Sequence, residues 1–278
     1  MMSGQGEVTN DPNDNSNFTY VANQANCTSG DKDEQFECMQ QADPLDIADV
    51  LQTYDPKAAK SLAFLPKWDN QTTFSNYTDI QVRGRFSKLV RIHPTLPPSY
   101  RASPDVQQPQ IIGTCDNEYA GLVPRTMVPP NQTVIDNLSD TIFVCRAAKA
   151  AKARQVIGSP IWRYRYFGEW PNQNPLQWMH AYHGSDVAMV FGTTSTFAPD
   201  TTIQAEISVY MQSVFVEFTK DPEHALTDNF GWPRYIEDQD TLVRLAYNNE
   251  TRPSFVRGSY YDDNCDSTQA LRDGHYVG

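Results

Sequence analysis

Short β-rich runs alternate with helical runs along much of the chain, and this alternation restricts the possible folds more than any other feature. "PQIIGT" and "PIWRYRYF" are predicted as strands, because both are rich in β-branched or aromatic residues and end at turn signals. "SDTIFVCRAAKAAKARQV" and "TTIQAEISVYMQSVFVEFTKDP" are predicted as helices. The pattern predicts an α/β fold with a mostly parallel sheet and flanking helices. One face of the second helix should be buried through Ile203, Ile207, Tyr210, Met211, Val214 and Phe218.

The first part of the chain is more polar and less regular. A helix is predicted around "FTYVANQA", and a second in "DPLDIADVLQTY", where Asp43 is a suitable N-cap and Pro44 suits the first turn. The segment 61–89 has a loop-like composition, and the tail 241–278 is predicted to form short strands and turns.

The segment 90–108, "VRIHPTLPPSYRASPDVQQ", interrupts the pattern because it has four prolines and no periodicity. A long surface loop is one interpretation. An intron retained in frame is the other, since a valine codon begins with GT, a glutamine codon can end with AG, and 19 residues correspond to 57 nucleotides (19 × 3). Both interpretations predict a dispensable segment outside the packed core.

Composition excludes some classes of partner and indicates a compartment. The net charge of −12 and the lack of any Lys/Arg run longer than two argue against nucleic acid, and no run of 18 apolar residues could span a membrane. Five cysteines and seven N-x-[ST] triplets are typical of a secreted glycoprotein. The N-terminus lacks a signal peptide, so we expect a secreted precursor to have further residues upstream. The triplets begin at Asn17, Asn26, Asn70, Asn76, Asn131, Asn137 and Asn249.

Glu118 and His183 are the candidate catalytic residues. Glu118 follows the predicted strand "PQIIGT", and His183 lies in the loop after "PIWRYRYF". Functional groups of open α/β sheets gather at the carboxyl ends of the strands. An acid followed by a histidine also matches the order Ser…Asp/Glu…His of the α/β-hydrolase triad. In such a triad the acid orients the imidazole and the histidine removes the serine proton.

Two other kinds of site use some of the same residues. His180, His183 and Asp186 are spaced three apart and could be metal ligands, but the glycine between the last two breaks helical periodicity, so no metal is expected. Cys115 with His183 could form a thiol nucleophile pair. A cysteine next to an apolar strand is more often a buried small side chain, which makes the thiol pair the weaker interpretation.

Six blocks of the sequence resemble the type-B carboxylesterase family, which includes cholinesterases and secreted fungal esterases and lipases. They are "MMSGQ", "GTCDNEYAGL", "WRYRYFGEW", "AYHGSDVAMVFGT", "MQSVFVEFTKDP" and "WPRY". They cover nearly the whole chain in order, and the fungal branch is most similar. The resemblance implies an α/β-hydrolase fold in which residues 1–278 are the C-terminal part of one domain. It also implies hydrolysis of small-molecule or lipid carboxylic esters without a cofactor.

The same resemblance assigns roles to individual residues. Glu118 matches the family's triad acid and His183 its triad histidine. Asp186 matches a position that is often acidic, with no role assigned. The disulfides implied are Cys27–Cys38 and Cys145–Cys265, which leaves Cys115 as the odd cysteine.

The chain departs from the family at the nucleophile. It contains neither the motif G-x-S-x-G, typically GESAG, nor the paired glycines of the oxyanion loop. "MMSGQ" resembles the strand after the nucleophile, so we expect the serine to lie upstream of Met1 and residues 1–278 alone to fold poorly and be inactive. The alternative is a non-catalytic, cholinesterase-like secreted binding glycoprotein, which would need neither Glu118 nor His183. The sequence does not indicate which ester is cleaved or the oligomeric state.

Overall fold

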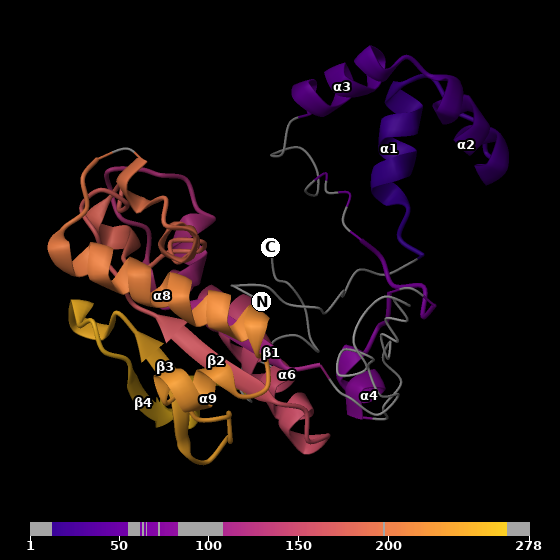
Figure 1. Ribbon diagram of the computed structural model, residues 1–278. Helices are drawn as coiled ribbons and strands as arrows, with labels where there is room; N and C mark the ends of the chain where they lie inside the picture. The colour runs from indigo at the N-terminus through magenta and orange to yellow at the C-terminus, as the bar shows by residue number, and fades with distance from the viewer. Residues whose placement is uncertain are drawn as a thin grey trace. The chain divides into compact units, whose positions relative to one another are not determined.

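A computed structural model of the protein describes residues 13–54, 62, 64, 66–71, 73–82, 108–196 and 198–265 (Figure 1). The chain divides into two compact units, one of residues Glu7–Tyr77 and one of Met1–Gly6 with Thr78–Gly278. The segment 90–108 lies outside the described residues except for Gln108. No described helix is long and apolar enough to cross a membrane.

Three helices make up most of the described part of the first unit: α1 (Ser16–Gln24), α2 (Lys32–Gln41) and α3 (Pro44–Thr53). The predicted N-cap of α3 is confirmed, because the Asp43 side chain accepts a hydrogen bond from the Leu45 backbone N–H. The disulfide Cys27–Cys38, with 5.7 Å between the Cα atoms, connects the end of α1 to α2. The short helix α4 (Tyr77–Val82) follows, so the prediction of a loop over 61–89 was wrong for these six residues.

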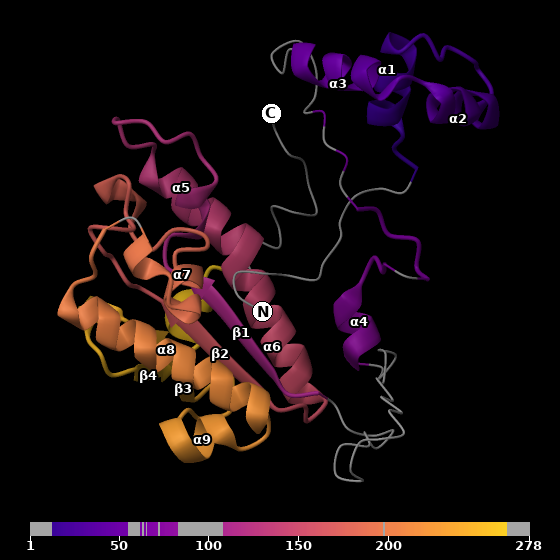
Figure 2. The ribbon, with the colours of Figure 1, turned by 45° about the horizontal axis from the view of Figure 1, so that its top comes forward.

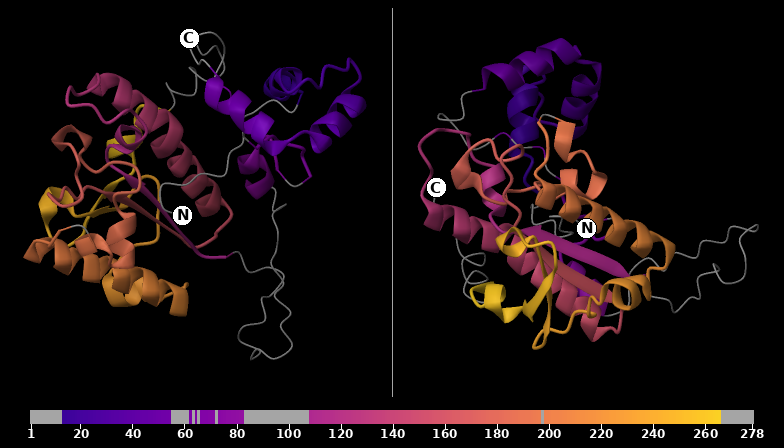
Figure 3. Two further views of the ribbon diagram at one scale, coloured as in Figure 1. Left: turned by 90° about the horizontal axis from the view of Figure 1, so that it is seen from above. Right: turned by 60° about the vertical axis from the view of Figure 1, so that its left-hand side comes forward.

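The second unit is built on a four-stranded sheet in the order β1 (Gln110–Cys115), β2 (Ile161–Tyr166), β3 (Asp240–Leu245) and β4 (Ser254–Arg257). The first three strands are parallel, and β4 is antiparallel to β3. Helices α6 (Cys145–Val156) and α8 (Thr202–Lys220) lie on opposite faces of the sheet (Figures 2 and 3). This mostly parallel sheet with flanking helices confirms the predicted fold class. The remaining helices are α5 (Gln132–Ser139), α7 (Val187–Phe191), α9 (Ala225–Phe230) and α10 (Ser259–Asp262).

Strand β2 is at the centre of the packing, and all six of its residues are buried. Its even-numbered aromatic residues belong to the main core cluster together with Ile207 and Met211 of α8. The prediction that Ile203 shares this buried face was wrong, since it is 48% exposed. Gln204 takes the buried position in that turn because its amide caps α8 and also donates to the Asn172 side chain at 2.8 Å.

The helix predicted over 139–156 begins earlier and is interrupted. Asn131 caps α5 by accepting a hydrogen bond from the Thr133 N–H, so helical structure starts at Gln132. A π-helical turn, Asp140–Val144, then joins α5 to α6. Such turns have one residue more than an α-turn and are frequent at functional sites.

Candidate active site

Glu118 lies just beyond the carboxyl end of β1, where it starts a short 3₁₀ turn, Glu118–Gly121. Its side chain is fully buried, and both carboxylate oxygens are hydrogen-bonded. Oε1 accepts the backbone N–H of Cys115 at 2.7 Å, and Oε2 lies 2.7 Å from Nδ1 of His183. A buried carboxylate is costly unless it is hydrogen-bonded, so these contacts account for its retention in the core and fix its orientation.

His183 lies in the loop between β2 and α7, and backbone contacts attach this loop to the Glu118 turn. Asn117 and Tyr182 form a parallel β-bridge, and the His183 N–H donates to the Glu118 carbonyl at 3.2 Å. Gly121 allows this close approach, because a Cβ at that position would be 2.9 Å from Cβ of His183. The two loops are therefore held together by backbone as well as by the side-chain pair.

The carboxylate of Glu118 changes the pKa of the His183 imidazole. The hydrogen bond that Glu118 accepts from His183, together with the charge of the carboxylate, raises the pKa of His183 above the ordinary 6.5, while burial opposes the rise. The His183 side chain is 34% exposed, and within the described part of the chain Nε2 has no hydrogen-bond partner. A proton on Nδ1 is the tautomer that donates to Glu118, which leaves Nε2 to accept a proton. The pair can thus act as an oriented general base.

A second buried acid lies near this pair. Asp186 is fully buried, and its Oδ2 accepts the hydroxyl of Tyr164 at 2.7 Å. Burial raises the pKa of Asp186 above its ordinary value, and the bond from Tyr164 partly offsets this. The ring of Tyr164 fits because its cross-strand partner is Gly113, where a Cβ would be 1.9 Å from the ring Cζ.

The residues of the two alternative sites make other contacts in the described part of the chain. His180 is bonded through Nδ1 to Glu169 at 3.0 Å, and both side chains are 46% exposed. Across the described ranges there is no group of three His, Cys, Asp or Glu side chains that could hold a metal ion. The Cys115 thiol is fully buried and accepts a contact from the Ser185 hydroxyl at 3.8 Å. The structure brings together Glu118 and His183, with Asp186 nearby.

Two residues of this neighbourhood were not identified from the sequence. Tyr164 was predicted only as part of a strand, and no pattern marked its hydroxyl as the partner of Asp186. Phe143 has its ring centroid 4.8 Å from that of His183, although 40 residues separate them (183 − 143). Its placement depends on the π-helical turn, which no sequence pattern predicted.

A cleft of about 430 Å³ opens beside the histidine loop. Tyr182, Gly184 and Ser185 line it on the loop side, and Arg125 is its one charged lining residue. Asn172, Gln173 and several threonines supply further polar groups. A molecule that entered this cleft would meet hydrogen-bonding groups close to His183 in the chain.

Known proteins are similar in sequence to this chain. The model of the carboxylesterase family matches residues 127–266, which is 140 of the 278 residues and includes His183. Secreted lipase 5 of Gibberella zeae is 28% identical over 269 residues, which cover 92% of this chain and 47% of the lipase. Chlorogenic acid esterase of Aspergillus niger is 26% identical over 273 residues, which cover 93% of this chain and 49% of the esterase. The chain spans about half the length of these curated relatives.

Proposed function

Because the chain belongs to the carboxylesterase family, we propose that it supplies the acid and the base of a carboxylic ester hydrolase. Glu118 is the acid and His183 the base. The nucleophilic serine and the donors of the oxyanion hole would come from residues outside this chain, since no G-x-S-x-G motif and no paired glycines occur in it. No cofactor takes part in this chemistry.

The proposed reaction has two steps. Nε2 of His183 accepts the serine proton as the oxygen attacks the ester carbonyl, and the resulting imidazolium returns the proton to the departing alcohol. Water then attacks the acyl-enzyme while His183 again accepts a proton, which releases the carboxylic acid and the free serine. In both steps the role of Glu118 is to hold the ring and stabilise the imidazolium.

The observation that carries this proposal is the contact between Oε2 of Glu118 and Nδ1 of His183. It is 2.7 Å long, its acid is fully buried, and its histidine is partly exposed. An ion pair on the surface needs neither a buried acid nor a difference in exposure between its two members. His180 and Glu169 form such a pair in the same region, with both members 46% exposed.

The proposals for the substrate and the compartment rest on the relatives' names, on the disulfides and on the exposure of the N-x-[ST] asparagines. The relatives are named as a secreted lipase and a chlorogenic acid esterase, so we propose small-molecule or lipid esters as substrates and an extracellular location. Two disulfides fit an oxidising compartment. Five of the seven proposed glycosylation sites are exposed, and the others, Asn17 and Asn249, are half-buried.

Expression of the chain with its upstream coding region tests the proposal. The longer protein should hydrolyse a short-chain chromogenic ester, and residues 1–278 alone should not. His183→Ala and Glu118→Ala should each remove most of the activity, because members of a triad act as a unit. His180→Ala removes the exposed histidine that is paired with Glu169, and it should leave the activity unchanged.

Two results would contradict the proposal. Activity that persists in His183→Ala would exclude this histidine as the base. An intact upstream region that lacks the serine would favour the non-catalytic binding glycoprotein instead.

A further inference from the structure

The ring of Phe143 is in contact with the candidate base. Its centroid lies 4.8 Å from that of the His183 ring, with 42° between the ring planes, and Phe143 is only 7% exposed. Packing at this distance restricts rotation of the imidazole. Glu118 fixes the imidazole through a single atom, Nδ1, and a single bond of this kind leaves the ring free to tilt about it. Phe143 supplies a second point of contact.

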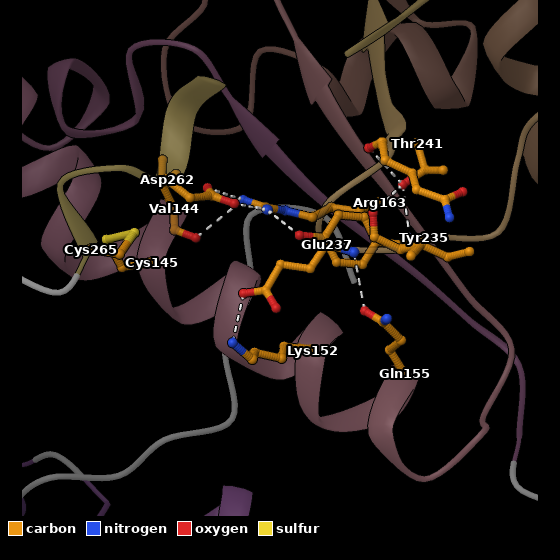
Figure 4. A network of polar contacts seen from close by, with 12 residues as sticks. Val144, Cys145, Lys152, Gln155, Arg163, Tyr235, Glu237, Thr241, Asp262 and Cys265 are labelled. Carbon is orange, nitrogen blue, oxygen red and sulfur yellow. Dashed lines mark hydrogen bonds and ion pairs between the residues drawn. A yellow bond between two sulfur atoms is a disulfide. The ribbon is translucent and has the colours of Figure 1, made fainter. Parts of the chain in front are cut away.

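Phe143 reaches this position from the π-helical turn Asp140–Val144, which is connected to α10 and the residues that follow it. The side chain of Asp140 is hydrogen-bonded to Asn264. The Val144 carbonyl accepts a hydrogen bond from Arg163 at 3.4 Å, and Arg163 is in turn bonded to Asp262 through both carboxylate oxygens (Figure 4).

The third connection is covalent. Cys145, the residue after the turn, forms a disulfide with Cys265, with 5.1 Å between the Cα atoms (Figure 4). The start of the turn is also attached to the other member of the pair. The hydroxyl of Ser139 accepts the backbone N–H of Tyr119, the residue after Glu118. One short turn is therefore bonded to the Glu118 turn at its beginning and to the C-terminal region at its end.

From these contacts we propose that Phe143 is a positioning residue for His183, and that the turn Asp140–Val144 keeps it in place through its attachments to α10 and Cys265. The inference deepens the proposed ester hydrolysis and rests on it for the kinetic readout. Phe143 makes no contact with reacting atoms in this proposal. It limits the orientations of the ring so that Nε2 is directed consistently while Nδ1 stays bonded to Glu118.

The first test compares Phe143→Ala with Phe143→Leu in the complete protein. Loss of the ring should lower kcat by roughly ten- to a hundred-fold, the scale on which small misplacements of a catalytic group act, with little change in KM. Leucine keeps most of the apolar volume and should restore much of kcat. Phe218→Ala is the matched control, because Phe218 of α8 packs on Trp162 near the start of β2, whereas His183 lies in the loop that follows the end of β2.

A spectroscopic readout separates positioning from a general loss of stability. The Nδ1 proton of a histidine bonded to a buried carboxylate gives a downfield NMR resonance that is protected from exchange. It should be sharp in the wild type, in Phe143→Leu and in Phe218→Ala, and broadened or absent in Phe143→Ala. A Phe143→Ala protein that keeps both this resonance and kcat within twofold would overturn the proposal.

The disulfide provides a test that does not alter Phe143. Replacing Cys145 and Cys265 by alanine should change kcat and the Nδ1 resonance in the same direction as Phe143→Ala, but less. Replacing Cys27 and Cys38, whose bridge lies in the other unit, should change neither. Equal effects of the two bridges would contradict the proposed attachment. If the wild type hydrolyses no ester, the proposed function fails, and the resonance still decides the role of Phe143.

Discussion

Removal of the Asp262 carboxylate should destabilise the sheet unit by several kcal/mol. Its partner Arg163 projects from the centre of β2, and the arginine side chain is 2% exposed. Burial by itself lowers the pKa of Arg163, but the charge and hydrogen bonds of Asp262 outweigh it and raise the pKa further above its ordinary range. Because the guanidinium of arginine is not deprotonated in proteins, it stays charged in the core whether or not Asp262 is present to balance it.

The size of the effect follows from what would remain around the guanidinium. In Asp262→Ala it keeps Tyr235 Oη at 3.3 Å and the Val144 carbonyl at 3.4 Å, both long contacts, while its Nε already has no partner within the described residues. Breaking one side of a buried ion pair costs about 3–5 kcal/mol. With a urea slope of roughly 2–3 kcal/mol per molar, the midpoint should fall by about 1–2 M.

Urea unfolding of the complete protein, followed by tryptophan fluorescence, measures this shift. Asp240→Ala is the matched control: it breaks the pair with Arg257, whose side chains are 67% and 70% exposed, and should cost about 0–1 kcal/mol. Arg163→Met combined with Asp262→Leu removes both charges and should recover most of the loss. Equal losses for Asp262→Ala and Asp240→Ala would refute the argument from desolvation.

Three further outcomes are expected. Glu118→Gln should lower kcat by about 10³–10⁴-fold and move the acid limb of the pH–rate profile to lower pH, because the carboxylate that raises the pKa of His183 is lost. Gly113→Ala should cost about 3 kcal/mol or more in urea unfolding, since its Cβ would overlap the fixed ring of Tyr164. Tyr164→Phe should cost about 1–3 kcal/mol, because buried Asp186 loses one of its hydrogen-bond donors. This cost should grow as pH rises through the folded pKa of Asp186, which is raised above its ordinary value, because the Tyr164 hydroxyl stabilises the ionised carboxylate of the folded wild type.

The sequence predicted those features that depend on short-range pattern. The β-rich composition of "PIWRYRYF" located β2, and the order of strand, acid, strand and histidine located Glu118 and His183 at the carboxyl ends of two neighbouring parallel strands. Parallel strands bring such loops together wherever the intervening chain is helical. Their 2.7 Å contact follows from the topology, and the topology follows from the alternation of elements.

What the sequence did not predict depends on long-range partners. Arg163 and Asp262 are 99 residues apart, and neither occurs in a motif. Phe143 reads as an ordinary apolar position of a helix, and only a π-helical turn directs it to His183. Ile203 has the right spacing for the buried face of α8, but Gln204 satisfies the helix N-terminus from the buried side instead.

The two buried acids near His183, Glu118 and Asp186, have different hydrogen-bond partners. Glu118 accepts two hydrogen bonds, from the Cys115 N–H and from Nδ1 of His183. Asp186 accepts the Tyr164 hydroxyl and is also hydrogen-bonded to Cys115, but burial outweighs these contacts and raises its pKa. Both acids raise the pKa of the His183 imidazole, and the hydrogen bond to Glu118 is the largest contribution. Glu118 therefore acts on the imidazole through a direct hydrogen bond, whereas Asp186 acts on it only through its charge.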